Sequence, residues 1–122
     1  DMEKTLIIRD KEYRLKSSLF SIISYKNTFG SELFSDISVL DTISSKEELT
    51  TLSTVIDVIF RITYILHKPF TNQSYDEFLG GFDFAILSDV KELEAIANTI
   101  AELLGTVKEK ADEQPKKEIP HP

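Results

Sequence analysis

Residues 45–68 read SKEELTTLSTVIDVIFRITYILHK and predict a long central helix. Ser45 and Glu48 have the spacing of a capping box, in which each side chain accepts a hydrogen bond from a backbone N–H of the first turn. Apolar residues then recur at the helical period, and the second half of the segment is apolar on nearly every side. Such a helix is either buried at the centre of a domain or keeps one face for a partner. Pro69 prevents the helix from continuing beyond positions 67 or 68.

Two charged residues, Asp57 and Arg61, interrupt this apolar stretch. Their spacing places them on neighbouring turns of one helix face, where they form a local ion pair or both face a partner. We favour the local pair. The same charges interrupt the longest apolar stretch, Val55 to Leu66, which is too short to span a bilayer. The first dozen residues do not resemble a secretory signal, so we expect a soluble protein of the cytoplasm.

The residues near the N-terminus predict a β-hairpin over residues 5–16, TLIIRDKEYRLK. The first strand is β-branched and apolar, and the second alternates apolar and charged side chains. Residues 9–12 are expected to form the turn, although they lack the Asn-Gly or Asp-Gly pair typical of tight hairpins. An isolated hairpin is only marginally stable in water, so we expect it to pack against the helical body.

Four further helical segments are predicted around the central one. The first begins at a serine cap, ends at Gly30, and has its apolar positions at Leu19, Phe20, Ile22 and Ile23. The second covers residues 31–40, and a capping box at Ser74 and Glu77 opens a third that ends at Gly80-Gly81. The last runs from about residue 89 to residue 107 with one apolar stripe. The predicted fold is therefore mainly α, a single domain over residues 5–107 with about four to five helices and an N-terminal hairpin.

The composition changes at Lys108. Residues 108–122, KEKADEQPKKEIPHP, contain three prolines, many charges and one large apolar residue. A segment of this kind cannot bury enough apolar surface to offset the entropy of ordering it. We therefore predict a disordered C-terminal tail.

The overall composition narrows the classes of function. The 122 residues fit one domain, and 41% of them are hydrophobic, enough for one core. The absence of cysteine excludes disulfides, thiolate metal sites and cysteine nucleophiles. A net charge of −7 disfavours nucleic acid and anionic membranes as partners, because both attract basic surfaces.

No residue pattern in the chain predicts catalysis or a cofactor. The only histidines are His67, at the end of the central helix where a cation is favoured, and His121, in the tail. Neither belongs to a metal-ligand spacing, and Gly80-Gly81 lies outside any phosphate-binding motif. We therefore expect no catalytic, cofactor-binding or metal-binding residues, and a protein that is not an enzyme.

Eight phenylalanines point instead to protein binding. Most of them are expected in the core. Phe70, Phe82 and Phe84 lie in connectors beside helix breakers, where exposure is favoured. Exposed aromatic side chains that cluster mark a binding face, so these three form the predicted partner-binding surface.

Part of the chain resembles the tail assembly chaperones of long-tailed, siphovirus-like phages and prophages of Gram-positive bacteria. Those proteins typically begin with a "GKEYxLx" hairpin, followed by a helix that runs into "FG" and an aromatic-acidic segment. The corresponding stretches here are KEYRLK (11–16) and YKNTFGSELFSDI (25–37). The likeness extends more loosely over residues 5–104, and Asp10 stands where a turn glycine is common. The matching residues are Lys11, Glu12, Tyr13, Leu15, Phe29, Gly30, Leu33, Phe34, Asp36 and Ile37.

The resemblance implies a helical, non-enzymatic chaperone of the host cytoplasm. Such chaperones bind the tape measure protein and the tail tube protein during tail assembly and are absent from the finished virion. The family assigns no catalytic residues, cofactor, nucleic-acid partner or membrane partner. Apolar surface that serves a client would also support self-association.

Two other functions compete with this interpretation. A generic helical regulatory or adaptor module of a mobile element would bind one defined partner rather than an extended client. An acidic DNA mimic would need carboxylates arrayed at phosphate-like spacing on one face. Here the acidic residues are spread over helix caps and the tail, alongside fourteen basic residues, which disfavours the mimic.

Overall fold

The computed structural model describes residues 2–39 and 49–118, with side chains for residues 2–39 and 53–105. Within these residues five α-helices follow an antiparallel β-hairpin, which confirms the predicted mainly helical fold. The elements in chain order are β1 (Glu3–Ile8), β2 (Lys11–Lys16), α1 (Leu19–Phe29), α2 (Leu33–Ile37), α3 (Leu49–His67), the 3-10 turn η2 (Lys68–Phe70), α4 (Tyr75–Gly80), the 3-10 turn η3 (Phe84–Ser88) and α5 (Val90–Glu118).

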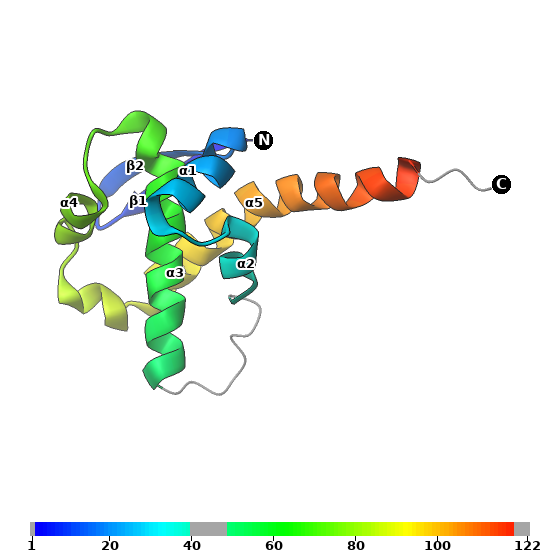
Figure 1. The fold of residues 1–122 in the computed structure, drawn as a ribbon. Helices are drawn as coiled ribbons and strands as arrows, with labels where there is room; N and C mark the ends of the chain where they lie inside the picture. Colours follow the sequence, from blue (N-terminus) through cyan, green and yellow to red (C-terminus); the bar gives the residue numbers. More distant parts are fainter. Residues whose placement is uncertain (1, 40–48, 119–122) are drawn as a thin grey trace.

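Helix α3 is the centre of the fold. Figure 1 shows it running through the middle of the molecule, and it contacts β2, α1, α2, α4 and α5. Because neighbours surround it on most sides, its side chains are apolar almost all round, as expected of a buried central helix. The predicted capping box at Ser45 and Glu48 lies outside the described residues. The buried residues of α3 are Val55, Val58, Ile59, Phe60, Ile62, Thr63, Tyr64, Ile65 and Leu66.

The hairpin packs one face against the helices. Strand β2 contacts α3 and strand β1 contacts α5, and the side chains facing them are buried. The turn is tighter than predicted, because Ile8 pairs with Lys11 and only Arg9 and Asp10 lie between the strands. Both turn residues have positive φ, 53° and 66°. This is the twist that a two-residue hairpin loop requires, and it explains why a turn without glycine still closes. The buried residues of the hairpin are Leu6, Ile8, Tyr13 and Leu15.

Helix α1 begins and ends where the sequence predicted, but its buried face differs. Ser18 is the N-cap, and Gly30 ends the helix with φ of 77°. The helix buries Ser21, Ser24 and Tyr25, whereas three of the four apolar positions named from the sequence are exposed. On this buried side the Tyr25 hydroxyl donates to Asp36 Oδ2 at 2.7 Å, which joins α1 to α2. The exposed apolar residues are Leu19, Phe20 and Ile23.

Helix α5 extends further than its apolar stripe. Among the α5 residues whose side chains are described, which end at residue 105, the last buried ones are Leu103 and Leu104; the helical backbone continues to Glu118 and projects away from the body in Figure 1. The sequence favoured a disordered tail for residues 108–122. Lysine, glutamate, alanine and glutamine are good helix formers, which favours helical backbone in this segment, and Pro115 is the residue in it that disfavours a helix. The domain boundary predicted after residue 107 stays a prediction.

Candidate functional site

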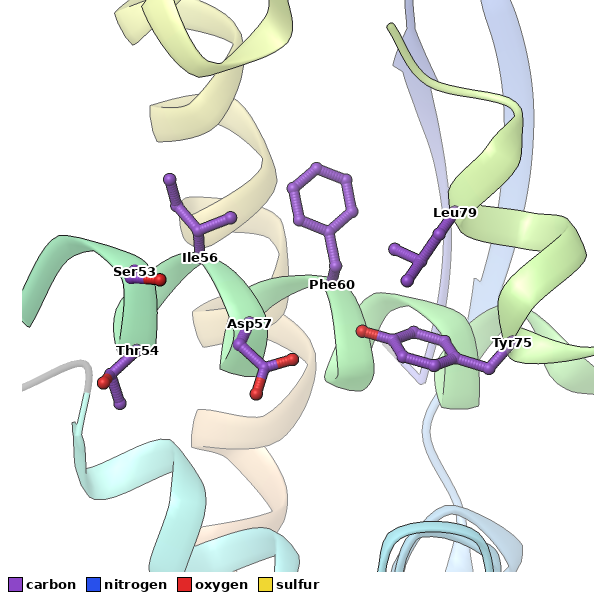
Figure 2. Close-up of a pocket in the computed structure, with 7 residues that line it drawn as sticks. All are labelled: Ser53, Thr54, Ile56, Asp57, Phe60, Tyr75 and Leu79. Carbon is purple, nitrogen blue, oxygen red and sulfur yellow. The ribbon is translucent and has the colours of Figure 1, made fainter. Parts of the chain in front are cut away.

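Two adjoining hollows lie beside helix α3. They have volumes of about 490 and about 400 Å³, and they share Ile56, Phe60 and Leu79 in their walls. We call the two together the α3–α4 groove. The first hollow is also lined by Ser53, Thr54, Asp57 and Tyr75 (Figure 2), and the second by Phe82, Asp83, Phe84, Ile86 and Leu87.

The sequence builds this groove from two helix faces. On α3 the lining residues at positions 53, 56, 57 and 60 follow the spacing of one helix face, and Thr54 lies next to them. Helix α4 is fixed opposite by the predicted capping box, in which the Ser74 N–H donates to Glu77 Oε1 at 2.8 Å and the Glu77 N–H donates to Ser74 Oγ at 3.1 Å. Tyr75 and Leu79, one turn apart on α4, therefore face α3. Figure 2 shows Tyr75 reaching from α4 toward α3, where Phe60 and Asp57 project.

The groove exposes apolar side chains to solvent. Phe84 is 85% exposed, and Leu79 and Leu87 are 38% and 37% exposed. Asp57 and Asp83 are its charged lining residues, and no lysine or arginine lines it. An apolar surface with a polar rim is typical of a protein-binding site.

Asp57 is held by a neighbour on its own helix. Its Oδ1 lies 3.3 Å from Arg61 Nε, which confirms the predicted local ion pair. The Arg61 guanidinium also lies over the Phe29 ring, 4.9 Å from its centroid, and so packs α1 against α3. Burial, aided by the charge of Asp57, raises the pKa of Tyr75 to about 12. At neutral pH the Tyr75 phenol is therefore an uncharged hydrogen-bond donor in the wall of the groove.

The structure brings together two of the three predicted surface phenylalanines. Phe82 and Phe84 both line the α3–α4 groove, but Phe82 is half-buried among other aromatic rings. Phe70 is not among the lining residues; it lies in η2 beneath the Arg14 guanidinium, 4.3 Å from its ring centroid. The exposed apolar surface of the groove is thus carried by Phe84 together with Leu79 and Leu87.

Most of the other residues of the groove were not predicted as binding residues from the sequence. Ile56, Tyr75 and Leu79 belong to the predicted helices, and nothing in their local pattern distinguishes them from core residues. The signal that points to them is that the apolar stripe of α3 is wider than one buried face requires, with Ile56 at its edge. Which edge remains uncovered depends on the placement of α4, and no local pattern fixes that placement.

His67 joins two elements of the fold. His67 ends α3, and its Nδ1 lies 2.9 Å from the carbonyl oxygen of Arg14, to which it donates when protonated there. Its ring packs edge-on against Tyr13 at 5.1 Å, so it joins α3 to β2. His121 lies outside the described residues. In the part of the chain with described side chains, no three histidine, aspartate or glutamate residues gather as metal ligands would. None of the described helices combines the length and apolarity needed to cross a bilayer.

No protein-family model, curated protein or solved structure matches this chain. The likeness to tail assembly chaperones therefore rests on the sequence motifs of residues 11–16 and 25–37 and the looser likeness over residues 5–104. Several of the matching residues have structural roles, because Tyr13 and Leu15 are buried in the core and Gly30 ends α1. The α3–α4 groove is therefore the structural feature on which a proposal of function can rest.

Proposed function

We propose that this protein is a non-enzymatic chaperone that binds an amphipathic helix of a client protein in the α3–α4 groove. The observation that carries the proposal is the exposure of Phe84 at the wall of an apolar groove between two helices. Helix-in-groove recognition requires a hollow of this kind, in which apolar anchors from successive turns of the bound helix are buried. The net charge of −7 opposes aggregation through repulsion between molecules, so the protein can carry such an apolar surface in solution.

The resemblance of the N-terminal region suggests which client this is. We propose the tape measure protein of a long-tailed phage as the principal client, with the tail tube protein as a second partner. A tape measure protein is long and helical, and its apolar faces need shielding until tube subunits polymerise around it. A small acidic domain with an exposed apolar groove suits this task, because many copies can bind successive segments of the same client.

The competing proposal is an adaptor or regulatory module of a mobile element. It would use the same groove, but for one short helix of one partner. The two proposals differ in stoichiometry, since a chaperone of an extended client binds in many copies and an adaptor binds one to one.

Co-expression with the tape measure protein encoded by the same genome tests the proposal. We expect the wild-type protein to keep the client soluble and to copurify with it in several copies. The variant Phe84→Ser removes the exposed anchor and should lose the client. The matched control is Ile7→Thr, which removes an apolar side chain that is 58% exposed on β1, away from the groove. Equal retention of the client by Phe84→Ser and wild type would exclude the groove, and a one-to-one complex would favour the adaptor.

A further inference from the structure

The side chain of Arg9, in the turn of the hairpin, joins the hairpin to η3 and α5. Its Nη1 donates to Asp89 Oδ2 at 3.2 Å, and its Nη2 lies 3.5 Å from Asp83 Oδ1. On α5, Glu92 Oε2 accepts a hydrogen bond from the Arg9 backbone N–H at 2.8 Å, and Glu92 Oε1 lies 3.5 Å from Arg9 Nε. We call these four residues the Arg9 clamp.

The Arg9 clamp holds both ends of η3, the turn that forms one wall of the α3–α4 groove. Asp83 directly precedes this turn, Phe84–Ser88, and Asp89 directly follows it. The residues between them include the exposed Phe84 and two further lining residues of the groove. A single guanidinium that pairs with both flanking residues therefore fixes the path of the turn.

The turn has little stability of its own. A 3-10 turn has poorer hydrogen-bond geometry than an α-helix. Here the Ile86 N–H donates to the Asp83 carbonyl at 3.3 Å, and the Asp89 N–H donates to the Ile86 carbonyl at 3.1 Å. Contacts with the rest of the fold must therefore keep η3 in place.

The backbone and the charges both indicate that Arg9 is kept for this contact. Arg9 has a φ of 53°, a conformation that is costly for any residue with a side chain and persists where surrounding contacts enforce it. Its planar fork of five donors can reach several carboxylates at once. Glu92 is only 18% exposed, so without the arginine three carboxylates would repel one another around a partly buried site.

We propose that Arg9 is a positioning residue of the α3–α4 groove, which holds η3, and with it Phe84, in the conformation that accepts a client helix. Arg9 does not line either hollow of the groove, so it acts through η3 rather than by touching the client. When η3 is out of place a molecule cannot bind, and the apparent affinity falls with the fraction of molecules in the competent state. The role in binding rests on the proposed function, whereas the hold on η3 is a property of this chain alone.

Amide hydrogen exchange, measured by NMR on the purified protein without a client, tests the hold on η3. In Arg9→Gln the Ile86 and Asp89 amides should exchange at least about fivefold faster, a factor that corresponds to about 1 kcal/mol. Arg9→Lys keeps the charge but not the fork, and should lie between Arg9→Gln and the wild type. The matched control is Arg14→Gln, which removes the ion pair with Glu3 from the same hairpin. It should leave the exchange of both amides unchanged, because Arg14 does not contact η3.

Asp89→Asn disrupts the Arg9 clamp from its other side and serves if Arg9→Gln does not fold. Asparagine is as good an N-cap as aspartate, so the hydrogen bond from the Glu92 N–H to residue 89 at the start of α5 is kept while the charge is lost. The Ile86 amide should again exchange faster. In the double variant with Arg9→Gln the two effects should not add, because both changes break the same contact.

Client retention in the co-expression experiment tests the role in binding. Arg9→Gln should retain less client than the wild type, and Arg14→Gln should retain as much. Unchanged exchange of the Ile86 amide in Arg9→Gln would overturn the proposal, and so would full retention of the client by Arg9→Gln where Phe84→Ser loses it. Retention of the client by Phe84→Ser would instead contradict the proposed function, and the exchange rates would then decide by themselves whether Arg9 holds η3.

Discussion

The ring of Phe82 stacks on the ring of Tyr13, with the centroids 5.8 Å apart and 29° between the planes. Phe78 and Phe60 close around Phe82 with edge contacts at 5.1 and 5.3 Å. These contacts join the connector after α4 to β2 and α3. Phe82 therefore fixes the connector that forms one wall of the groove. Phe84, two residues further along the connector, stays exposed to solvent.

This division of roles predicts different stabilities for two similar variants. Phe82→Ala should lower the free energy of unfolding by about 2–4 kcal/mol, somewhat less than the loss at a fully buried phenylalanine. Phe84→Ala should change it by less than about 0.5 kcal/mol, as at other exposed positions. Equilibrium urea denaturation measures both values. Equal losses would show that Phe84 packs as tightly as Phe82.

Sequence patterns predicted where the helices and strands lie better than they predicted which face of each helix is buried. Gly30 and the Ser74–Glu77 capping box mark helix ends through local backbone chemistry, and both appear where predicted. The burial of helix α1 could not be predicted in the same way. Its buried side includes Tyr25, which hydrogen-bonds to Asp36 on α2, and such a tertiary contact is not visible in the apolar periodicity of the helix itself. A surface that a protein reserves for a partner has the composition of a core, so sequence alone assigns it to the inside.

The hairpin turn offers a stabilising substitution. Arg9 and Asp10 both adopt positive φ, and glycine is the residue that does so without steric cost. Asp10→Gly should raise the free energy of unfolding, because it relieves a left-handed backbone cost of about 1–2 kcal/mol that exceeds the roughly 0.5–1 kcal/mol of extra chain entropy that glycine loses on folding. Asp10→Ala is the control and should be neutral or destabilising, since alanine gains nothing at positive φ. Thermal unfolding of the wild type and the two variants measures the effect. A lower midpoint for Asp10→Gly than for the wild type would contradict the prediction.

Shortening one buried side chain at the centre of α3 should greatly lower the free energy of unfolding. Ile59 is 3% exposed, so Ile59→Ala should leave a cavity and cost on the order of 2–5 kcal/mol. Ile23→Ala makes the same chemical change on the exposed face of α1 and should cost less than about 0.5 kcal/mol. Urea denaturation compares the two. A loss below that level at Ile59 would mean that the helix is not the structural centre.

The tyrosines predict how stability depends on alkaline pH. Burial raises the pKa of Tyr75 to about 12 and also raises the pKa of Tyr25, which donates to Asp36. The unfolded chain loses these protons near pH 10 while the folded protein keeps them. Stability is therefore fully present below pH 10 and decreases as pH rises toward the folded pKa. Tyr75→Phe should make this decrease shallower. Titration of tyrosinate absorbance measures the pKa values directly, and ionisation of all four tyrosines at pH 10 in the folded protein would contradict the prediction.

The end of α5 predicts where the chain can be shortened. Leu103 and Leu104 are buried, and the Leu103 carbonyl accepts a hydrogen bond from Ser17 Oγ at 3.2 Å, so the helix is anchored to the hairpin at this level. Beyond it the backbone projects from the body (Figure 1). Truncation after Val107 should therefore leave the thermal midpoint unchanged within a few degrees. Truncation after Thr99 is the matched comparison, because it also removes Ile100, Leu103 and Leu104 and should abolish cooperative unfolding. A large decrease in the midpoint of the longer fragment would show that residues 108–122 contribute to the fold, and would place the domain boundary beyond residue 107.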